Sequence, residues 1–425
     1  MTVVKVQLPY GSRDMVTVDL PITEDQIIAP KPIKPARDPE AVIAAALDNP
    51  LGTGGLESIV KAEHRINIIC DDITRPTPCH LILPILLERL LVLGVERSNI
   101  RIIMALGSHR YMTEAEMIRK VGEEIYQQYT VVNSEFKREE DLVSVGTTAE
   151  GVDITVSKVA LDADIKIGIG NIVPHPAMGW SGGAKIVFPG VASEETVKNF
   201  HIYQGLSDEN LYGLDECFIR TKVEQWTELI GLDFIINTVL DAEGRIYRVV
   251  AGDYRQAHRQ GVKYAKEIYH RPIREKADVV VVSSYPVDID LWQSTKGYLC
   301  GDHALKGRQG GTIILVSPNY EGVGPHPEYV DYIGRDSDEL LLEVERGGHF
   351  AGDPLALAIG NCVSKIRRRR NLVLVSDGIT KAEAEKAKLV YYPKAQLQEA
   401  VDRALAQYEN PRVLVITHGG ETLVS

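Results

Sequence analysis

Short apolar segments that alternate with helical segments constrain the fold of this 425-residue chain more than any other feature. In the first half, residues 66–70, 100–106 and 162–169 have the pattern of short strands. Helical patterns follow the first two, at 80–95 and from Thr113 onward, where Thr113 and Glu116 fit a capping box. Alternating strands and helices of this length are typical of a parallel sheet that is covered by helices on both faces.

A second run of the same kind begins near residue 277. Residues 278–283, 311–316 and 371–375 are short apolar strands, with helical segments such as 337–346 between them. A chain of this length exceeds one ordinary core, so we predict two α/β domains, each with a mainly parallel sheet flanked by helices. The predicted N-terminal domain spans 1–270 and the C-terminal domain 271–410. The strand pattern at 412–417 fits either sheet, so residues 410–425 could complete the first domain.

Charge and composition exclude several classes of partner. Lys and Arg number 47 against 59 Asp and Glu, a net charge of −12, which disfavours nucleic acid and anionic membranes. The most apolar long stretch, 80–95, is interrupted by Glu88 and Arg89 and suits a buried helix rather than a membrane span. The first 20 residues lack the apolar core of a signal peptide, and the five cysteines form no CxxC pair. We therefore expect a cytoplasmic protein.

Reactive side chains follow three of the strands predicted in the first domain. Asp71, Asp72 and Arg75 come after the first strand, in INIICDDITRP. His109 comes after the second strand, and His175 after the third. The carboxyl ends of parallel strands meet at one edge of a sheet, where ligands bind in open α/β proteins. We therefore predict one site there, although a single histidine after a strand is more often a structural residue.

A glycine-rich segment, GWSGGAKIVFPG at 179–190, follows His175. The N–H groups of Gly182 and Gly183 could cradle a phosphate, which would place Lys185 within reach of it. The spacing is not that of a P-loop. On these residues alone, Lys185 is either a solvated charge or a ligand-binding group, and His201 further on is an ordinary helix histidine.

The second domain contributes the segment YPVDIDLWQSTKGY. Asp288 and Asp290 could cap a helix that carries Trp292, Gln293 and Lys296. Residues four apart share a helical face, so Trp292 and Lys296 would lie together. The alternative is a surface lysine over a packed tryptophan.

These motifs together resemble the nickel-pincer lactate racemase family. DDITRP, GSHR, the run NIVPHP…GWSGGAKIVFPG…FH and WQSTK match in order, from about residue 66 to 300. The resemblance implies a two-domain α/β enzyme with its active site in the interdomain cleft. It also implies a racemase that interconverts D- and L-2-hydroxy acids, with lactate as the default substrate.

The same resemblance implies a nickel-pincer nucleotide, a pyridinium-derived mononucleotide with sulfur donors that is covalently held on Lys185. One carbon and two sulfur donors of this group and His201 would bind Ni(II), a donor set that suits a square-planar ion. Asp72 is expected beside Arg75 or the cofactor, and the Gly182–Gly183 turn near the cofactor phosphate. Loading would require the enzymes that build the cofactor.

The mechanism that the resemblance implies moves a hydride from the substrate C2 to the cofactor and back to the opposite face. His109 and His175 would act as the acid–base pair, one for each face. The expected substrate-binding residues are Arg75, Lys296, Gln293 and Trp292. Arg75 and Lys296, from different domains, would clamp the carboxylate.

Several alternatives stay open at this point. Lactate-active members are expected to carry Tyr at the position of Trp292, and the family's later Trp-Gln segment has no counterpart in residues 348–361. Malate, 2-hydroxyglutarate, an aromatic hydroxy acid and a sugar acid are therefore alternative substrates. Other functional classes are a pyridoxal phosphate enzyme with its Schiff base on Lys185 and a non-catalytic cofactor carrier or sensor. The sequence does not assign an oligomeric state, so a homo-oligomer stays open.

Overall fold

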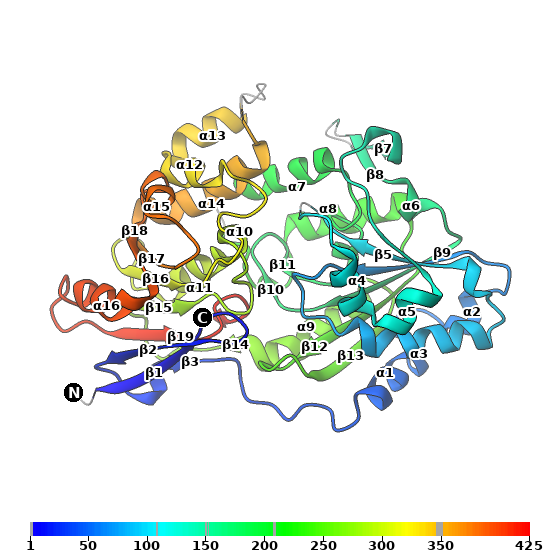
Figure 1. The fold of residues 1–425 in the computed structure, drawn as a ribbon, viewed down its shortest axis with the longest axis horizontal. Coiled ribbons are helices and arrows are strands. Elements are labelled where there is room, and N and C mark those ends of the chain that lie inside the picture. Colours follow the sequence, from blue (N-terminus) through cyan, green and yellow to red (C-terminus); the bar gives the residue numbers. More distant parts are fainter. Residues whose placement is uncertain (1–2, 108, 149–150, 152, 207–209, 346–351) are drawn as a thin grey trace.

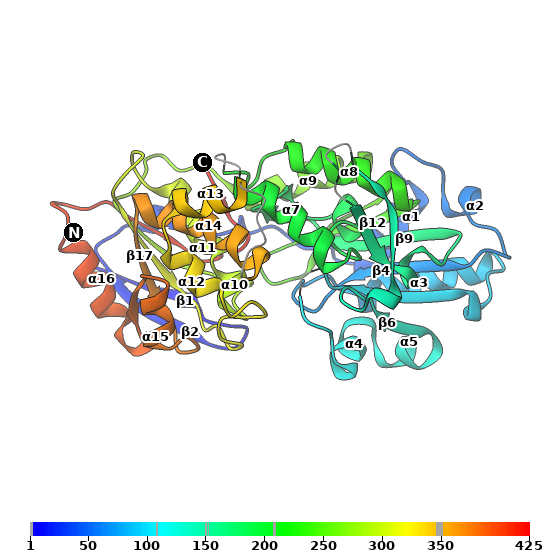
Figure 2. The ribbon, with the colours of Figure 1, turned by 90° about the horizontal axis from the view of Figure 1, so that it is seen from above.

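The computed structural model describes residues 3–107, 109–148, 151, 153–206, 210–345 and 352–425. Two halves lie along the long axis of the molecule, each built around a six-stranded sheet (Figures 1 and 2). Helices flank both sheets, so the predicted α/β class with two mainly parallel sheets is confirmed. In the part of the chain that the structure describes, no helix is both long and apolar enough to cross a membrane.

The first sheet has the strand order β13-β12-β9-β4-β5-β6. All neighbours pair in parallel except β12 and β13, which form an antiparallel pair. The strands are β4 (Ile66–Asp71), β5 (Ile100–Ala105), β6 (Thr130–Asn133), β9 (Ile165–Asn171), β12 (Phe234–Leu240) and β13 (Ile246–Gly252). The strands predicted at 66–70, 100–106 and 162–169 are thus confirmed as β4, β5 and β9.

Successive side chains of β4 enter different cores, as expected for a sheet covered on both faces. Ile68 packs in a core with α1 (Pro39–Asp48) and α3 (Cys79–Val92). Ile69 belongs to the core that contains α8 (Phe218–Ile230) and α9 (Gln256–Tyr269). The same half holds α2 (Leu56–Ile59), α6 (Lys158–Leu161) and α7 (Glu194–Leu206).

The helix predicted from Thr113 is present but is divided in two. Thr113 and Glu116 close the predicted capping box at the start of α4 (Glu114–Val121). Gly122, at a φ of 96°, ends that helix, and α5 (Glu123–Gln128) begins directly after it. A positive φ is accessible to glycine at little cost, and it stops the helical path.

The second sheet is parallel throughout, with the order β18-β17-β16-β15-β19-β3. Its strands are β3 (Ile27–Ile28), β15 (Val279–Ser283), β16 (Thr312–Val316), β17 (Asn371–Val375), β18 (Val390–Tyr392) and β19 (Val413–Ile416). One face packs on a helical layer of α11 (Lys296–Ala304), α12 (Tyr329–Gly334) and α14 (Pro354–Arg369), with α10 (Leu291–Ser294), α13 (Ser337–Glu345) and α15 (Lys381–Lys386) nearby. The other face packs on α16 (Leu397–Leu405) and the hairpin of β1 (Val4–Pro9) and β2 (Met15–Leu20).

The strand pairing differs from the predicted domain boundaries at both ends of the chain. Residues 1–28 were assigned to the first domain, but β3 pairs with β19 and the β1–β2 hairpin covers the second sheet. The proline-rich segment 29–38 then carries the chain across to the first half. We propose that the first domain spans 39–269, and that the second combines residues 1–28 with 271–425.

The two halves share a continuous core. In it, α7 of the first half packs against α14 of the second, and Asn361 Nδ2 donates to the carbonyl of Gly205 at 3.0 Å. Three short strand pairs complete the fold: β7 (Leu142–Thr147) with β8 (Asp153–Ser157), β10 (Pro174–His175) with β11 (Gly179–Trp180), and β14 (His270–Arg271) with β20 (Leu423–Val424). The carboxyl ends of β4, β5 and β9 therefore face the second half across a cleft.

Candidate active site

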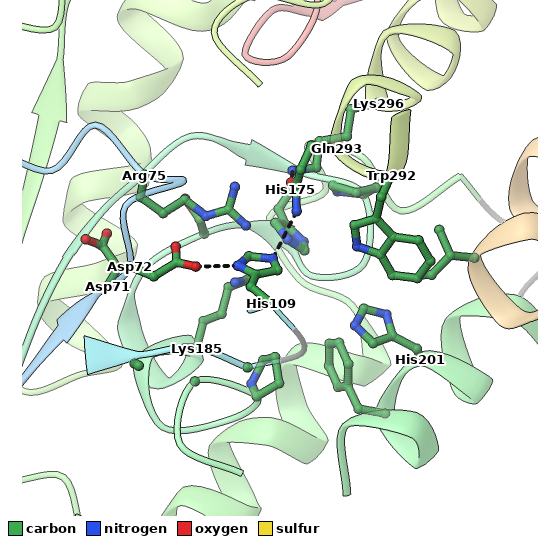
Figure 3. Close-up of a pocket in the computed structure, with 18 of the residues that line it drawn as sticks. Asp71, Asp72, Arg75, His109, His175, Lys185, His201, Trp292, Gln293 and Lys296 are labelled. Atoms are coloured by element: carbon green, nitrogen blue, oxygen red, sulfur yellow. Dashed lines mark hydrogen bonds and ion pairs between the residues drawn. The ribbon is translucent and has the colours of Figure 1, made fainter. Parts of the chain in front are cut away.

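One cavity lies between the two halves, at the carboxyl ends of β4, β5 and β9 (Figure 3). Its volume is about 1080 Å³, including the solvent space at its mouth. The residues of the predicted site that line it are Asp72, Arg75, His109, His175, Gly182, Lys185, His201, Trp292, Gln293 and Lys296. Side chains from widely separated segments thus meet in one place, as predicted; Gly183 does not line the cavity.

A chain of hydrogen bonds crosses the cleft. Lys296 Nζ donates to Gln293 Oε1 at 2.7 Å, and Gln293 Nε2 donates to His109 Nε2 at 2.9 Å. His109 Nδ1–H in turn donates to Asp72 Oδ2 at 2.5 Å. These partners assign His109 as the neutral tautomer that carries its proton on Nδ1. The lone pair on Nε2 is therefore available to a substrate that displaces the Gln293 amide.

Burial and neighbouring charge set the protonation of this pair. Burial alone raises the pKa of Asp72, but His109 and Arg75 outweigh it and hold that pKa below its usual range. Burial lowers the pKa of His109, although Asp72 opposes this shift. At neutral pH the carboxylate is therefore ionised and the imidazole neutral. This is the state that a general base requires.

His175 differs from His109 in the ring nitrogen that carries the proton. It lies in β10, and its Nδ1 accepts a hydrogen bond from the Ala177 N–H at 3.1 Å. The neutral ring therefore carries its proton on Nε2. Burial lowers the pKa of His175 well below its ordinary value, and the charges of Lys185 and Lys296 lower it further. Two neutral imidazoles thus line the cavity, one with a lone pair and one with an N–H group to offer.

Lys185 is a half-buried lysine in the lining of the cavity. It lies in the short 3-10 turn η4 (Gly183–Ile186). Burial, together with the positive charge of Arg75, lowers its pKa to about 7, although Asp72 opposes the shift. A substantial fraction of the side chain is therefore the free amine at neutral pH. A free amine is the form that attacks an electrophile to make a covalent bond.

The glycine turn before Lys185 is tight, and one of its two N–H groups that were predicted to bind a phosphate is already in use. Gly182 has a φ of +79°, and a Cβ there would lie 2.7 Å from Asn237 Oδ1. The Gly183 N–H already donates to that oxygen at 2.8 Å, so in this conformation it is not available to a phosphate. The buried Arg220 donates to the Gly182 carbonyl at 3.2 Å. The two glycines therefore allow a tight turn that Asn237 and Arg220 stabilise.

His201 and Trp292 lie on the other side of the cavity from Asp72 and Arg75 (Figure 3). His201 is on α7, and its ring meets that of Phe200 edge-on at a centroid distance of 4.8 Å. In the described parts of the chain, no three His, Cys, Asp or Glu side chains are grouped so as to hold a metal ion. A metal beside His201 would therefore need further donors from a bound group.

The helix predicted to carry Trp292 and Lys296 is interrupted between them. Asp290 caps α10 by accepting from Gln293 N at 2.7 Å, which confirms that part of the prediction. Asp288 does not cap it, because its side chain accepts from Gly11 N at 2.9 Å. The helix then ends at Ser294, and Lys296 begins α11, so Trp292 and Lys296 belong to two short helices.

Comparison with known proteins agrees with this geometry. Residues 10–211 match the family model described as the lactate racemase N-terminal domain. The lactate racemase of Lactiplantibacillus plantarum is 32% identical over 350 residues, which cover 80% of this chain and 81% of that protein. The lactate racemase of Thermoanaerobacterium thermosaccharolyticum is also 32% identical, over 75% of each chain.

The chain belongs to the lactate racemase family. It is accordingly an isomerase of the racemase type. The structure of the lactate racemase apoprotein from T. thermosaccharolyticum superposes with a TM-score of 0.87 at 26% identity, covering 99% of this chain and 100% of that one. A Thermotoga maritima protein shares the fold with a TM-score of 0.71 at 22% identity, covering 91% and 97% of the two chains.

One buried residue of this family site was not found from the sequence. Lys120, on α4, pairs with Asp71 Oδ1 at 2.8 Å and donates to the carbonyls of Asp72 at 3.0 Å and Arg75 at 2.9 Å. It therefore holds the loop that carries two of the predicted site residues. In the sequence it reads as one charge among several on an amphipathic helix, and only its burial reveals the contact.

Replacement of Lys120 by methionine should destabilise the protein strongly, because Asp71 would keep a buried charge without its partner. We expect a loss of about 3–5 kcal/mol in the free energy of unfolding, measured by denaturant titration. The neighbouring Arg119 is exposed, so Arg119→Met is the matched control and should change stability by less than about 0.5 kcal/mol. Equal effects of the two substitutions would contradict this account of the loop.

The lowered pKa of Lys185 predicts unusual reactivity. Labelling of the protein without cofactor by an amine-directed acylating reagent should show a midpoint near pH 7 at Lys185, because the free amine forms as the pH rises through its pKa. Peptide mass spectrometry gives the labelled fraction, and the 79% exposed Lys381 serves as the reference for reagent reactivity. A midpoint near the ordinary value of 10.5 would contradict the proposed environment.

Proposed function

We propose that this protein is a racemase of 2-hydroxy acids that works with a nickel-pincer nucleotide covalently bound to Lys185. One observation carries the proposal: a single buried cavity joins a free-amine lysine, two neutral histidines, a separate histidine and two basic side chains. Family membership supports a racemase, and both curated relatives are named lactate racemase. Lactate is therefore the first substrate to test.

The residues present fit such a cofactor. Lys185 would supply a half-buried amine for the covalent bond, and His201 would supply one imidazole ligand. The described residues offer no three-ligand metal site, which agrees with a metal held mainly by donors of the cofactor. The cavity joins Lys185 and His201 to the side chains proposed for the substrate, so a group held on Lys185 and a small acid would share one space.

The bound group would supply a carbon centre that accepts the substrate C2 hydride and returns it. His109 Nε2 takes the proton of the C2 hydroxyl, and the ionised Asp72 stabilises the imidazolium that forms. His175 donates a hydrogen bond from Nε2–H to the substrate oxygen from the other side, and the His109 imidazolium returns its proton to that oxygen once the hydride is back on C2. The two histidines come from different strand ends, so they can address a substrate from two directions.

Arg75 and Lys296 bind the substrate carboxylate. Burial, with the like charges of Arg75 and Lys185, lowers the pKa of Lys296 well below its ordinary value. An arriving carboxylate favours the ammonium form and relieves this repulsion. The two basic residues come from opposite halves, so substrate binding also draws the halves together and excludes water from the reaction.

The lining near Trp292 favours an apolar substituent on the substrate C2. The second half contributes Trp292, Leu299, Ile359, Cys362 and Val363 to the lining, together with the polar Gln293, Thr295 and Lys296. Among the described residues, the Lys and Arg side chains that line the cavity are the three already assigned: Arg75 and Lys296 to the carboxylate, and Lys185 to the cofactor. Lactate and aromatic hydroxy acids therefore fit the described lining better than malate or 2-hydroxyglutarate, whose second carboxylate would find no further Lys or Arg in that part of the chain.

Loading of the protein with the cofactor tests the proposed covalent bond to Lys185 and the proposed nickel ligand. Protein produced together with the cofactor-building enzymes should show an added mass on Lys185, and Lys185→Ala should show none. His201→Ala should keep the added mass but lose nickel, measured by elemental analysis. An adduct that survives Lys185→Ala, or full nickel occupancy in His201→Ala, would contradict the assignment. A visible chromophore released by hydroxylamine, without nickel, would favour the pyridoxal phosphate alternative.

Activity separates the racemase from a non-catalytic carrier or sensor. The loaded protein should racemise at least one apolar 2-hydroxy acid in a chiral panel that also contains malate, 2-hydroxyglutarate and a sugar acid. His109→Ala and His175→Ala should each lower kcat by at least about 100-fold, because general acid–base catalysis contributes that much, while the added mass on Lys185 remains. A loaded protein that racemises no 2-hydroxy acid would favour the carrier.

A further inference from the structure

Asn171 is a polar residue of the cavity that opens the NIVPHP run and to which the sequence analysis assigned no role. It is the last residue of β9, its exposed fraction is 4%, and it lines the cavity together with Asp71 and Lys185. Its position at a strand end is equivalent to that of the residues already assigned to the site. Asn171 therefore lies in the region where a ligand binds in folds of this kind.

Only the oxygen of the Asn171 carboxamide has a hydrogen-bond partner among the described residues. Its Oδ1 accepts from Thr238 Oγ1 at 3.4 Å, and its main-chain carbonyl accepts from Ser181 Oγ at 2.7 Å. The Nδ2 group is buried and has no hydrogen-bond partner among the described residues. A buried donor without a partner costs free energy, so folded proteins rarely keep one unless a ligand or an ion completes it.

The neighbouring Asn237 shows that this arrangement is specific to Asn171. Asn237 also lies at the heart of the first sheet, but both ends of its carboxamide are used. Its Oδ1 accepts from Gly183 N at 2.8 Å, and its Nδ2 donates to the Ile236 carbonyl at 3.1 Å. The fold therefore supplies partners for one asparagine of this pair and leaves the donor of the other unused.

The unused donor lies on the wall that carries the cofactor lysine. Ser181, whose hydroxyl donates to the main-chain carbonyl of Asn171, precedes Lys185 by only a few residues. The groups that clamp the substrate, Arg75 and Lys296, stand on the β4 loop and on the second half instead. A group tethered to Lys185 is therefore the ligand most suited to meet Asn171.

We propose that Asn171 binds the nucleotide held on Lys185, by donating a hydrogen bond from Nδ2 to an oxygen of that group. This inference rests on the proposed function, because it needs the tethered nucleotide. It takes the role that Gly183 was predicted to have, since the Gly183 N–H is already paired. Loading then completes the hydrogen bonding of a group that the protein without cofactor leaves unsatisfied.

The test compares stability and loading in two substitutions. Asn171→Leu removes the carboxamide and keeps its volume, and Asn171→Asp replaces the donor by an acceptor of the same shape. Without cofactor, Asn171→Leu should melt at the same temperature as the unmodified protein or higher, because it removes an unsatisfied donor. After production with the cofactor-building enzymes, both variants should carry about tenfold less adduct by intact mass. The rise in melting temperature on loading should also shrink.

Thr238→Val is the matched control, because it removes the partner of Asn171 Oδ1 and leaves Nδ2 in place. It should load like the unmodified protein. Equal adduct and an equal rise in melting temperature in the Asn171 variants would overturn the inference. A large fall in melting temperature without cofactor, with loading unchanged, would also overturn it by showing a purely structural role. Asn171→Ala extends the test if the leucine variant does not fold.

Different results would contradict the proposed racemase function and the proposed role of Asn171. If the unmodified protein gains no mass on Lys185, the proposed function fails and this inference fails with it. If the unmodified protein is loaded and the Asn171 variants are loaded equally, only the role of Asn171 is wrong.

Discussion

The hydrogen bond between Gln293 Nε2 and His109 Nε2 joins the two halves at the point where the reacting groups meet. On the first half it depends on Asp72, which fixes the His109 tautomer, and on the second half on Lys296, which orients Gln293. The donors all run in one direction, from the lysine toward the carboxylate. A substrate that takes the place of the Gln293 amide therefore finds a base already in the right protonation state.

A bidentate ion pair beside His109 holds the same interface. Arg110 donates to Glu321 of the second half, with Nη2–Oε1 at 2.9 Å and Nε–Oε2 at 3.2 Å. Its other edge contacts Glu116, the residue that closes the capping box of α4. The loop that carries His109 is therefore tied both to its own half and to the opposite one. Ser108, which precedes His109 in the GSHR motif, lies outside the described residues.

Charge explains how a protein with a net charge of −12 binds an anion. Arg75, Lys185 and Lys296 line one cavity, where Arg75 disfavours the protonated forms of both lysines and Lys185 disfavours that of Lys296. Asp71 and Asp72 offset part of this repulsion, and Lys120 in turn neutralises Asp71. Anionic ligands complete the balance, since a phosphate or a carboxylate favours the charged lysine. The cavity is thus locally positive, although the protein as a whole is negatively charged.

The sequence was most informative where reactive side chains directly follow a predictable strand. The ends of β4, β5 and β9 could be located from their apolar strands, and the side chains after them do meet in the cavity. Contacts between distant segments could not be predicted. The pairing of β3 with β19 joins residues almost 400 positions apart, and no local pattern encodes it. Lys120 and Asn171 likewise read as ordinary residues until burial shows what surrounds them.

The most direct test of the hydride mechanism follows the hydrogen on C2. A single enantiomer of an accepted 2-hydroxy acid is racemised in deuterated water by the loaded protein, and the product is analysed by mass spectrometry and NMR. Return of the same hydride predicts that both enantiomers keep their original hydrogen at C2. Incorporation of deuterium at C2 in step with racemisation would show that the enzyme removes a proton instead, and would contradict the proposed mechanism.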